Sequence, residues 1–133
     1  MIKEVGEYMG DKIALVSCSG LSPLGLVVRA ATVELALDND NIVAACITEY
    51  SAQPNQCNPI LEDAKIVSIT GCMDDCVSTI LKQKNVDVLK NIDAESIVKE
   101  HDLNPNDSVR LDDDGEKAVV ALKNYILKEL EII

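Results

Sequence analysis

Aromatic side chains are scarce in this chain of 133 residues. Phe and Trp are absent, and the aromatic residues are Tyr8, Tyr50 and Tyr125. Proteins that bind single-stranded nucleic acid stack bases on such side chains. Basic side chains are also few, since 12 Lys and Arg stand against 23 Asp and Glu and give a formal net charge of −11. A surface this acidic repels phosphate backbones and anionic lipid, so we expect neither nucleic acid nor a membrane as a partner.

Long hydrophobic runs are lacking as well. The first twelve residues mix charge with glycine and contain no apolar stretch typical of a secretory signal, and no later run approaches the length of a membrane span. We therefore expect a cytoplasmic protein. The length and the 47% hydrophobic content suit one core built from Leu, Ile, Val and Ala, so residues 1–133 are predicted to form a single α/β domain.

Short apolar runs alternate with helical patterns along the chain. Four runs are expected to be strands, the last of them at an edge of the sheet: 12–17, 41–47, 64–70 and 86–92. Ser22 is expected to cap a first helix that has Pro23 in its first turn. Three further helices are expected at 72–84, 93–101 and about 116–131. The alternation predicts a three-layer Rossmann-like or flavodoxin-like fold, with about four parallel strands in the order 2-1-3-4 and helices on both faces.

Four of the five cysteines lie at the end of a predicted strand or one turn into the helix that follows: Cys18, Cys46, Cys72 and Cys76. In an open parallel sheet, ligands bind beyond the carboxyl ends of the strands, where the strand order reverses. In the expected order Cys18 and Cys72 face each other across that crevice. Thiols stay reduced in the cytoplasm, so we interpret these residues as metal ligands, reactive thiolates or buried apolar side chains rather than as disulfides. The expected partner is a metal ion or a small molecule.

The spacing of the cysteines favours a shared site. Cys72 and Cys76 are four positions apart, which places two helical residues on one face, where both thiols can bind one ion. With Cys18 and Cys46 they supply the four thiolates of a tetrahedral zinc site. Cys46, within an apolar strand, is the one that best fits a buried inert side chain. Cys57 falls in a polar loop, and we interpret it as an exposed thiol or, alternatively, as a ligand in place of Cys46.

Small residues beside these cysteines are candidates for contact with a cofactor. Ser19 and Gly20 lie in the turn after the first strand, which can offer backbone N–H groups to an anion at a helix N-terminus. Gly71 directly precedes Cys72 and lets the backbone come close to a ligand. His101, in a charged helical stretch, is expected to be solvated. Residues 112–115 lack the remaining positions of a calcium loop and are expected to start a helix.

Three segments together resemble the DGC domain family, named for a central Asp-Gly-Cys motif: SCSGLSPLG at 17–25, the strand that holds Cys46, and ITGCMDDC at 69–76. The resemblance covers roughly the first ninety residues. Thr70 stands where the motif has aspartate, so this chain lacks the carboxylate of the motif while keeping its glycine and cysteine. The resemblance implies zinc binding by four chelating cysteines, which correspond to Cys18, Cys46, Cys72 and Cys76 and leave Cys57 outside the set. It implies no particular reaction.

Two further functions stay open for the same cysteines. A helix N-terminus lowers the pKa of a thiol, so Cys72 and Cys76 could carry sulfur or form a reversible disulfide without a permanent metal, although Asp74 and Asp75 oppose this electrostatically. The four thiolates could also bind an iron–sulfur cluster. Neither the pattern nor the resemblance decides whether the protein is an enzyme, or whether a zinc ion would be structural or catalytic.

Overall fold

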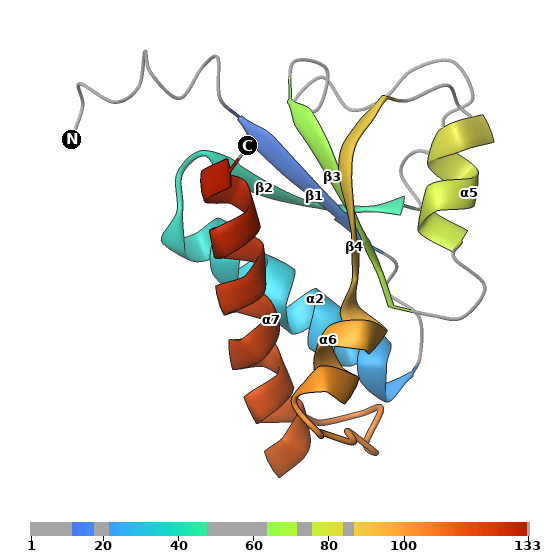
Figure 1. Cartoon of the computed structure of the whole chain (residues 1–133), viewed down its shortest axis with the longest axis vertical. Helices are drawn as coiled ribbons and strands as arrows, with labels where there is room; N and C mark the ends of the chain where they lie inside the picture. Colours follow the sequence, from blue (N-terminus) through green and yellow to red (C-terminus); the bar gives the residue numbers. More distant parts are fainter. Residues whose placement is uncertain (1–11, 18–21, 48–63, 72–75, 84–86, 133) are drawn as a thin grey trace.

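A computed structural model describes residues 12–17, 22–47, 64–71, 76–83 and 87–132 (Figure 1). Four parallel strands form one sheet in the order β2-β1-β3-β4. Their bounds are Ile13–Ser17 for β1, Ile42–Cys46 for β2, Lys65–Thr70 for β3 and Val88–Asp93 for β4. This arrangement confirms the predicted α/β class, the parallel pairing and the reversal of strand order between β1 and β3. It also confirms that the last strand lies at an edge of the sheet.

The helices are α2 at Pro23–Asp38, α5 at Cys76–Gln83, α6 at Ala94–Glu100 and α7 at Asp113–Ile132. Ser22 caps α2 as predicted, because its side-chain oxygen accepts a hydrogen bond from the Gly25 N–H at 2.9 Å and Pro23 follows in the first turn. The helix expected from residue 72 is described from Cys76 onward, and residues 72–75 lie outside the described ranges. In the part of the chain that the structure describes, no helix is long and apolar enough to cross a membrane.

The helix α7 begins at Asp113, three residues before the expected start near 116. The cause is Asp112, whose backbone carbonyl accepts the Glu116 N–H at 2.9 Å while its carboxylate accepts the Gly115 N–H at 2.7 Å. The same carboxylate accepts the Asn106 N–H at 2.9 Å and so ties the preceding segment to the helix. The acidic run at 112–115 is therefore a helix start, as expected.

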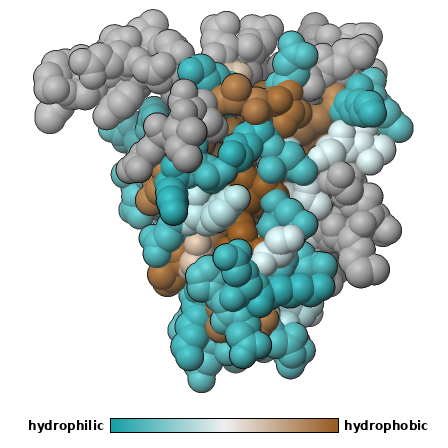
Figure 2. Space-filling model, in the orientation of Figure 1, coloured by the Kyte–Doolittle hydropathy of each residue, from teal (hydrophilic) through white to brown (hydrophobic). Residues whose placement is uncertain are grey.

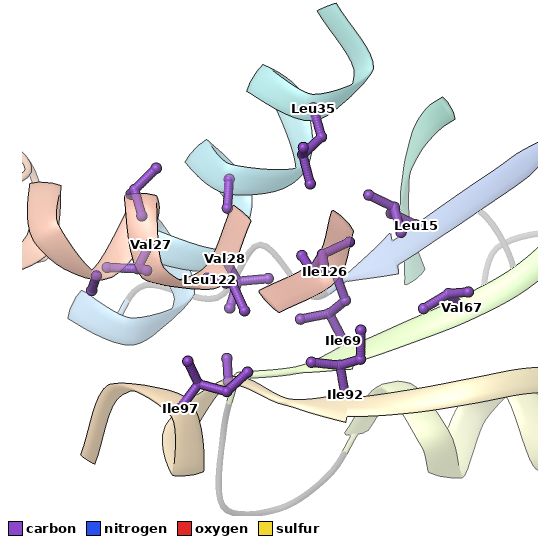
Figure 3. Close-up of a cluster of buried hydrophobic side chains, with 14 of the residues drawn as sticks. Leu15, Val27, Val28, Leu35, Val67, Ile69, Ile92, Ile97, Leu122 and Ile126 are labelled. Carbon is purple, nitrogen blue, oxygen red and sulfur yellow. The ribbon is translucent and has the colours of Figure 1, made fainter. Parts of the chain in front are cut away.

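Side chains of the strands point alternately to two hydrophobic clusters, one on each face of the sheet. In the larger cluster Leu15 and Ile69 pack against α2, α6 and α7, and Figure 3 shows Val28, Ile97 and Leu122 reaching toward them from these three helices. The smaller cluster contains alternate strand residues beneath α5: Ala14, Val16, Ala45 and Ile66, packed with Val77 and Leu81. Helices therefore cover both faces, as predicted.

The surface carries the acidic charge of the chain. Figure 2 shows a hydrophilic lower end, where α6, the segment 101–112 and the start of α7 lie. Lys90 of β4 forms an ion pair with Glu129 of α7, and this hydrogen bond raises the pKa of Lys90. Lys123 of α7 bonds Glu34 of α2 at 2.9 Å. Lys90 and Lys123 thus link α7 to β4 and to α2.

We expect Leu122→Ala to lower the free energy of unfolding by about 2–5 kcal/mol, because the fully buried side chain leaves a cavity where α7 meets the larger cluster. Leu37→Ala makes the same chemical change at a position of α2 that is 79% exposed, and should alter stability by no more than about 0.5 kcal/mol. Urea unfolding of both variants checks this. Equal losses would contradict the packing described here.

We expect Asp112 to make stability depend on acid pH. Backbone N–H groups of Asn106 and then Gly115 hold the pKa of its carboxyl below the usual value. A depressed folded-state pKa gives stabilisation that is complete above about pH 4 and is lost as the pH falls through the lower folded value. Asp112→Asn keeps a capping oxygen but does not titrate there. Its unfolding free energy should therefore fall less between pH 4 and pH 2 than that of the natural chain, and parallel curves would refute the assignment.

Candidate metal centre

The pairing register brings the carboxyl ends of three strands to one edge of the sheet. Ser17, the last residue of β1, pairs with Cys46, the last residue of β2, and on its other side with Ile69 of β3. Neighbouring strands lie about 4.8 Å apart, so the three ends span roughly 10 Å. Ser22, which caps α2, follows β1 after a break of four residues, so the first turn of α2 starts from this same edge.

The structure describes the chain next to each predicted cysteine ligand, but the thiol groups themselves lie outside the described residues. The backbone of Cys46 is the last residue of β2, and the backbone of Cys76 is the first described residue of α5. Cys18 and Cys72 are bonded in the chain to Ser17 and Gly71, and with Cys57 they lie outside the described residues, as do Ser19 and Gly20. Within the described ranges no group of three or more His, Cys, Asp or Glu side chains is placed to hold a metal ion. The four-cysteine site stays a prediction.

Gly71 closes a tight contact between β3 and α2. The residue is buried, and a Cβ atom built on it would lie 3.0 Å from Cγ2 of Val28 and 3.8 Å from the carbonyl oxygen of Leu24. A side chain at this position would require the Val28 side chain to shift in a packed core. This contact explains a glycine here through packing, and its predicted contact with a cofactor stays a prediction.

Near this edge the structure joins Thr70, which the sequence had singled out, to Ser68 and Asn91, which it had not. Ser68 Oγ donates to Asn91 Oδ1 at 2.7 Å, and Thr70 Oγ1 donates to the same oxygen at 3.1 Å. Ser68 and Thr70 alternate with the larger cluster and therefore lie on the α5 face of β3, with Asn91 beside them on β4. The available signal was the pair of hydroxyls at alternate positions of an otherwise apolar strand. We call Ser68, Thr70 and Asn91 the hydroxyl–amide cluster.

His101 stands apart from this edge. It is exposed at the C-terminal end of α6, and its ring Nδ1 lies 3.0 Å from the carbonyl oxygen of Ile97 one turn earlier. An imidazole in this position satisfies a helix C-terminus, in agreement with the interpretation of His101 as a solvated residue.

These features define an α/β domain built on one parallel sheet, in which the carboxyl ends of β1, β2 and β3 lie at the same edge. The family model for the DGC domain matches residues 14–122, and the chain belongs to this family. The match extends past the first ninety residues, where the resemblance was expected, and takes in β4, α6 and the first half of α7. No curated protein and no solved structure matches the chain.

Gly71→Ala should lower the free energy of unfolding by about 1 kcal/mol, because the new methyl group must displace Val28 in a packed core. Val28→Ala removes the obstructing methyl groups, so the double variant should lose less than the sum of the two single variants. Thermal or urea unfolding of the four proteins measures this coupling. Strictly additive losses would contradict the contact.

Proposed function

We propose that the protein binds one zinc ion through Cys18, Cys46, Cys72 and Cys76. The observation that carries the proposal is the strand register, which sets the last residues of β1 and β2 side by side and puts the end of β3 next to them. Each of these strand ends either is one of the four cysteines or precedes one within two residues. The chain belongs to the DGC domain family, and the resemblance to that family implies the same four cysteines as ligands.

The donor set fits zinc. Four thiolates are soft ligands that suit a tetrahedral d¹⁰ ion, and chains bind zinc in this way when a close pair of cysteines joins distant partners. Cys76 is the first described residue of α5, and a cysteine near a helix N-terminus is stabilised as a thiolate by the helix dipole and by backbone N–H groups. The N-terminus of α2 begins from the same edge and acts in the same direction.

The role of the ion depends on how many cysteines bind it. Four thiolates would cross-link three strand ends and the start of α5, whereas three thiolates and a water would leave a Lewis acid open to a small ligand. Gly71 keeps β3 close to α2, and Ser22 anchors the helix that returns from β1. These residues hold the ends of the strands in place whichever form is present. Thiolates persist in a reducing compartment, and we propose a cytoplasmic location.

Metal analysis of protein purified without oxygen should find one zinc per chain. Cys72→Ser should lose the metal, while Cys57→Ser makes the same change outside the proposed ligand set and should retain it. If the site is closed, chelation should also lower the melting temperature strongly, because structural zinc contributes to the free energy of folding.

Other outcomes would replace the proposal. Iron and inorganic sulfide on the same cysteines would assign an iron–sulfur cluster. A metal-free protein with a cysteine of depressed pKa would assign thiol redox or sulfur-transfer chemistry. A metal-free protein whose cysteines titrate normally would leave a binding module with inert thiols.

A further inference from the structure

The helix α2 is apolar on two opposite sides. Its inner side supplies four fully or almost fully buried residues to the larger cluster: Val27, Val28, Ala31 and Leu35. The only charged side chains among its 16 residues are Arg29, Glu34 and Asp38. A helix that is apolar beyond its core-facing side is normally covered on its other side as well. The outer side of α2 therefore has the composition of a surface that another element covers.

Four apolar residues form a second line along the outer side of α2: Leu26, Ala30, Val33 and Leu37. Successive members are four, three and four positions apart, which keeps them on one side of a helix in the pattern of a seam against another helix. Leu26 and Ala30 are half-buried, Val33 is 42% exposed and Leu37 is 79% exposed. We call these four residues the outer seam.

The helix α7 extends this apolar surface. It packs beside α2 on the same face of the sheet (Figure 1), and its Lys123 bonds Glu34 of α2. Val120 and Leu127 lie one turn before and one turn after Lys123, so they share its side of α7 and flank α2. Both are exposed, at 57% and 37%. With the outer seam they form an apolar patch across two helices, and such patches mark interaction surfaces.

We propose that this patch joins two copies of the chain, with their α2 helices packed antiparallel about a two-fold axis. A second copy carries the same patch, and a two-fold axis lets each patch cover the other. Antiparallel pairing sets Leu26 opposite Leu37 of the partner subunit. It also sets Ala30 opposite Val33 of the partner subunit, so that small and larger side chains meet at the centre. The same axis brings the two α7 helices together over their exposed apolar residues.

Charge favours a second copy at this surface. A net charge of −11 repels two chains in general. The charged side chains of α2 and the lysine that bonds it sum to zero, because Arg29 and Lys123 balance Glu34 and Asp38. Two copies can therefore approach through this surface without the repulsion that the rest of the chain imposes.

Charge also favours the antiparallel orientation. Arg29 lies in the first half of α2, is exposed, and forms no ion pair with an acidic residue in the described part of the chain. The last turn of α2 has no basic residue and ends at Asp38, so it is negative both by charge and by the helix dipole. Antiparallel pairing carries Arg29 toward that end of the partner's α2. Parallel pairing would instead set like charges level with one another.

The dimer is expected to be weak. The outer seam spans only roughly 16 Å along the helix axis, so we expect a dissociation constant of about 10 μM. At about 1 μM most chains would be monomers, and urea unfolding at that concentration reports the single chain. The small stability change expected for Leu37→Ala refers to that condition.

Analytical ultracentrifugation of the full chain at about 1 to 200 μM should show a monomer–dimer equilibrium. A reductant in the buffer excludes disulfides between chains. Leu37→Asp places a charge in the outer seam and should raise the dissociation constant by more than about 10-fold. Val109→Asp is the matched control, because Val109 is also 79% exposed but lies in the segment before α7, and it should leave the constant unchanged. Circular dichroism verifies that both variants fold.

Arg29→Glu tests the role of charge. It should raise the dissociation constant about 3- to 10-fold, and high salt should reduce this effect. Arg110→Glu makes the same change at an exposed arginine outside the patch and should have no effect. A natural chain that stays monomeric up to about 200 μM would overturn the proposal, since interfaces of this size still associate at such concentrations. Equal effects of Leu37→Asp and Val109→Asp, or oligomers larger than a dimer, would overturn it as well.

Discussion

The structure depends on β1 being buried on both faces and paired along both edges. All five residues from Ile13 to Ser17 are buried, and the strand lies between β2 and β3. Its alternate side chains belong to different hydrophobic clusters, Leu15 to the larger and Ala14 and Val16 to the smaller. A one-residue slip of this strand would exchange the two sets and disrupt both clusters. Register is therefore specified by the core, and the core thereby determines which residues meet at the carboxyl edge.

The strand register that the core requires also decides which residues lie together at the carboxyl edge of the sheet. The register that aligns Leu15 with Ala44 and Val67 also aligns Ser17 with Cys46 and Ile69. Gly71 then continues β3 next to Val28, so closely that a Cβ atom would lie 3.0 Å from Val28 Cγ2 and require that side chain to shift. The strand ends and the first turns of α2 are thus held by contacts that lie in the hydrophobic core. A site at this edge would inherit its geometry from rigid elements rather than from its own loops.

Much of the fold could be predicted because local signals and burial agree. Three strands are nearly continuous apolar runs, as buried parallel strands are, and Ser22 with Pro23 marks the start of α2 at the residue level. The sequence predicts the start of α7 near residue 116, three residues later than the structure shows. The earlier start depends on Asp112, which accepts hydrogen bonds from the backbone of Asn106 and of Gly115. Asn106 belongs to an irregular segment whose sequence has no periodic pattern. Local pattern does not encode such a contact.

In the candidate site, too, features set by local sequence pattern could be predicted and contacts between distant residues could not. The strand ends that the cysteines adjoin could be predicted from periodicity and topology, and the structure confirms that these ends share one edge. The convergence of the thiols themselves stays a prediction, because they lie outside the described residues. The link between Ser68 and Asn91 joins residues 23 positions apart in the chain. It depends on a register shift in the pairing of β3 with β4, between Ile66 and Val67, that no local pattern reveals.

The register shift places Asn91 where Thr70 can donate a hydrogen bond to it. Considered alone, Thr in place of the motif aspartate removes a charge; considered with Asn91, it exchanges an acceptor for a donor and reverses the direction in which the amide must point. Because Ser68 is buried and also donates, the two hydroxyls reinforce one orientation. In this chain position 70 therefore supplies a hydrogen-bond donor that, with Ser68, fixes the side chain of Asn91 and joins β3 to β4.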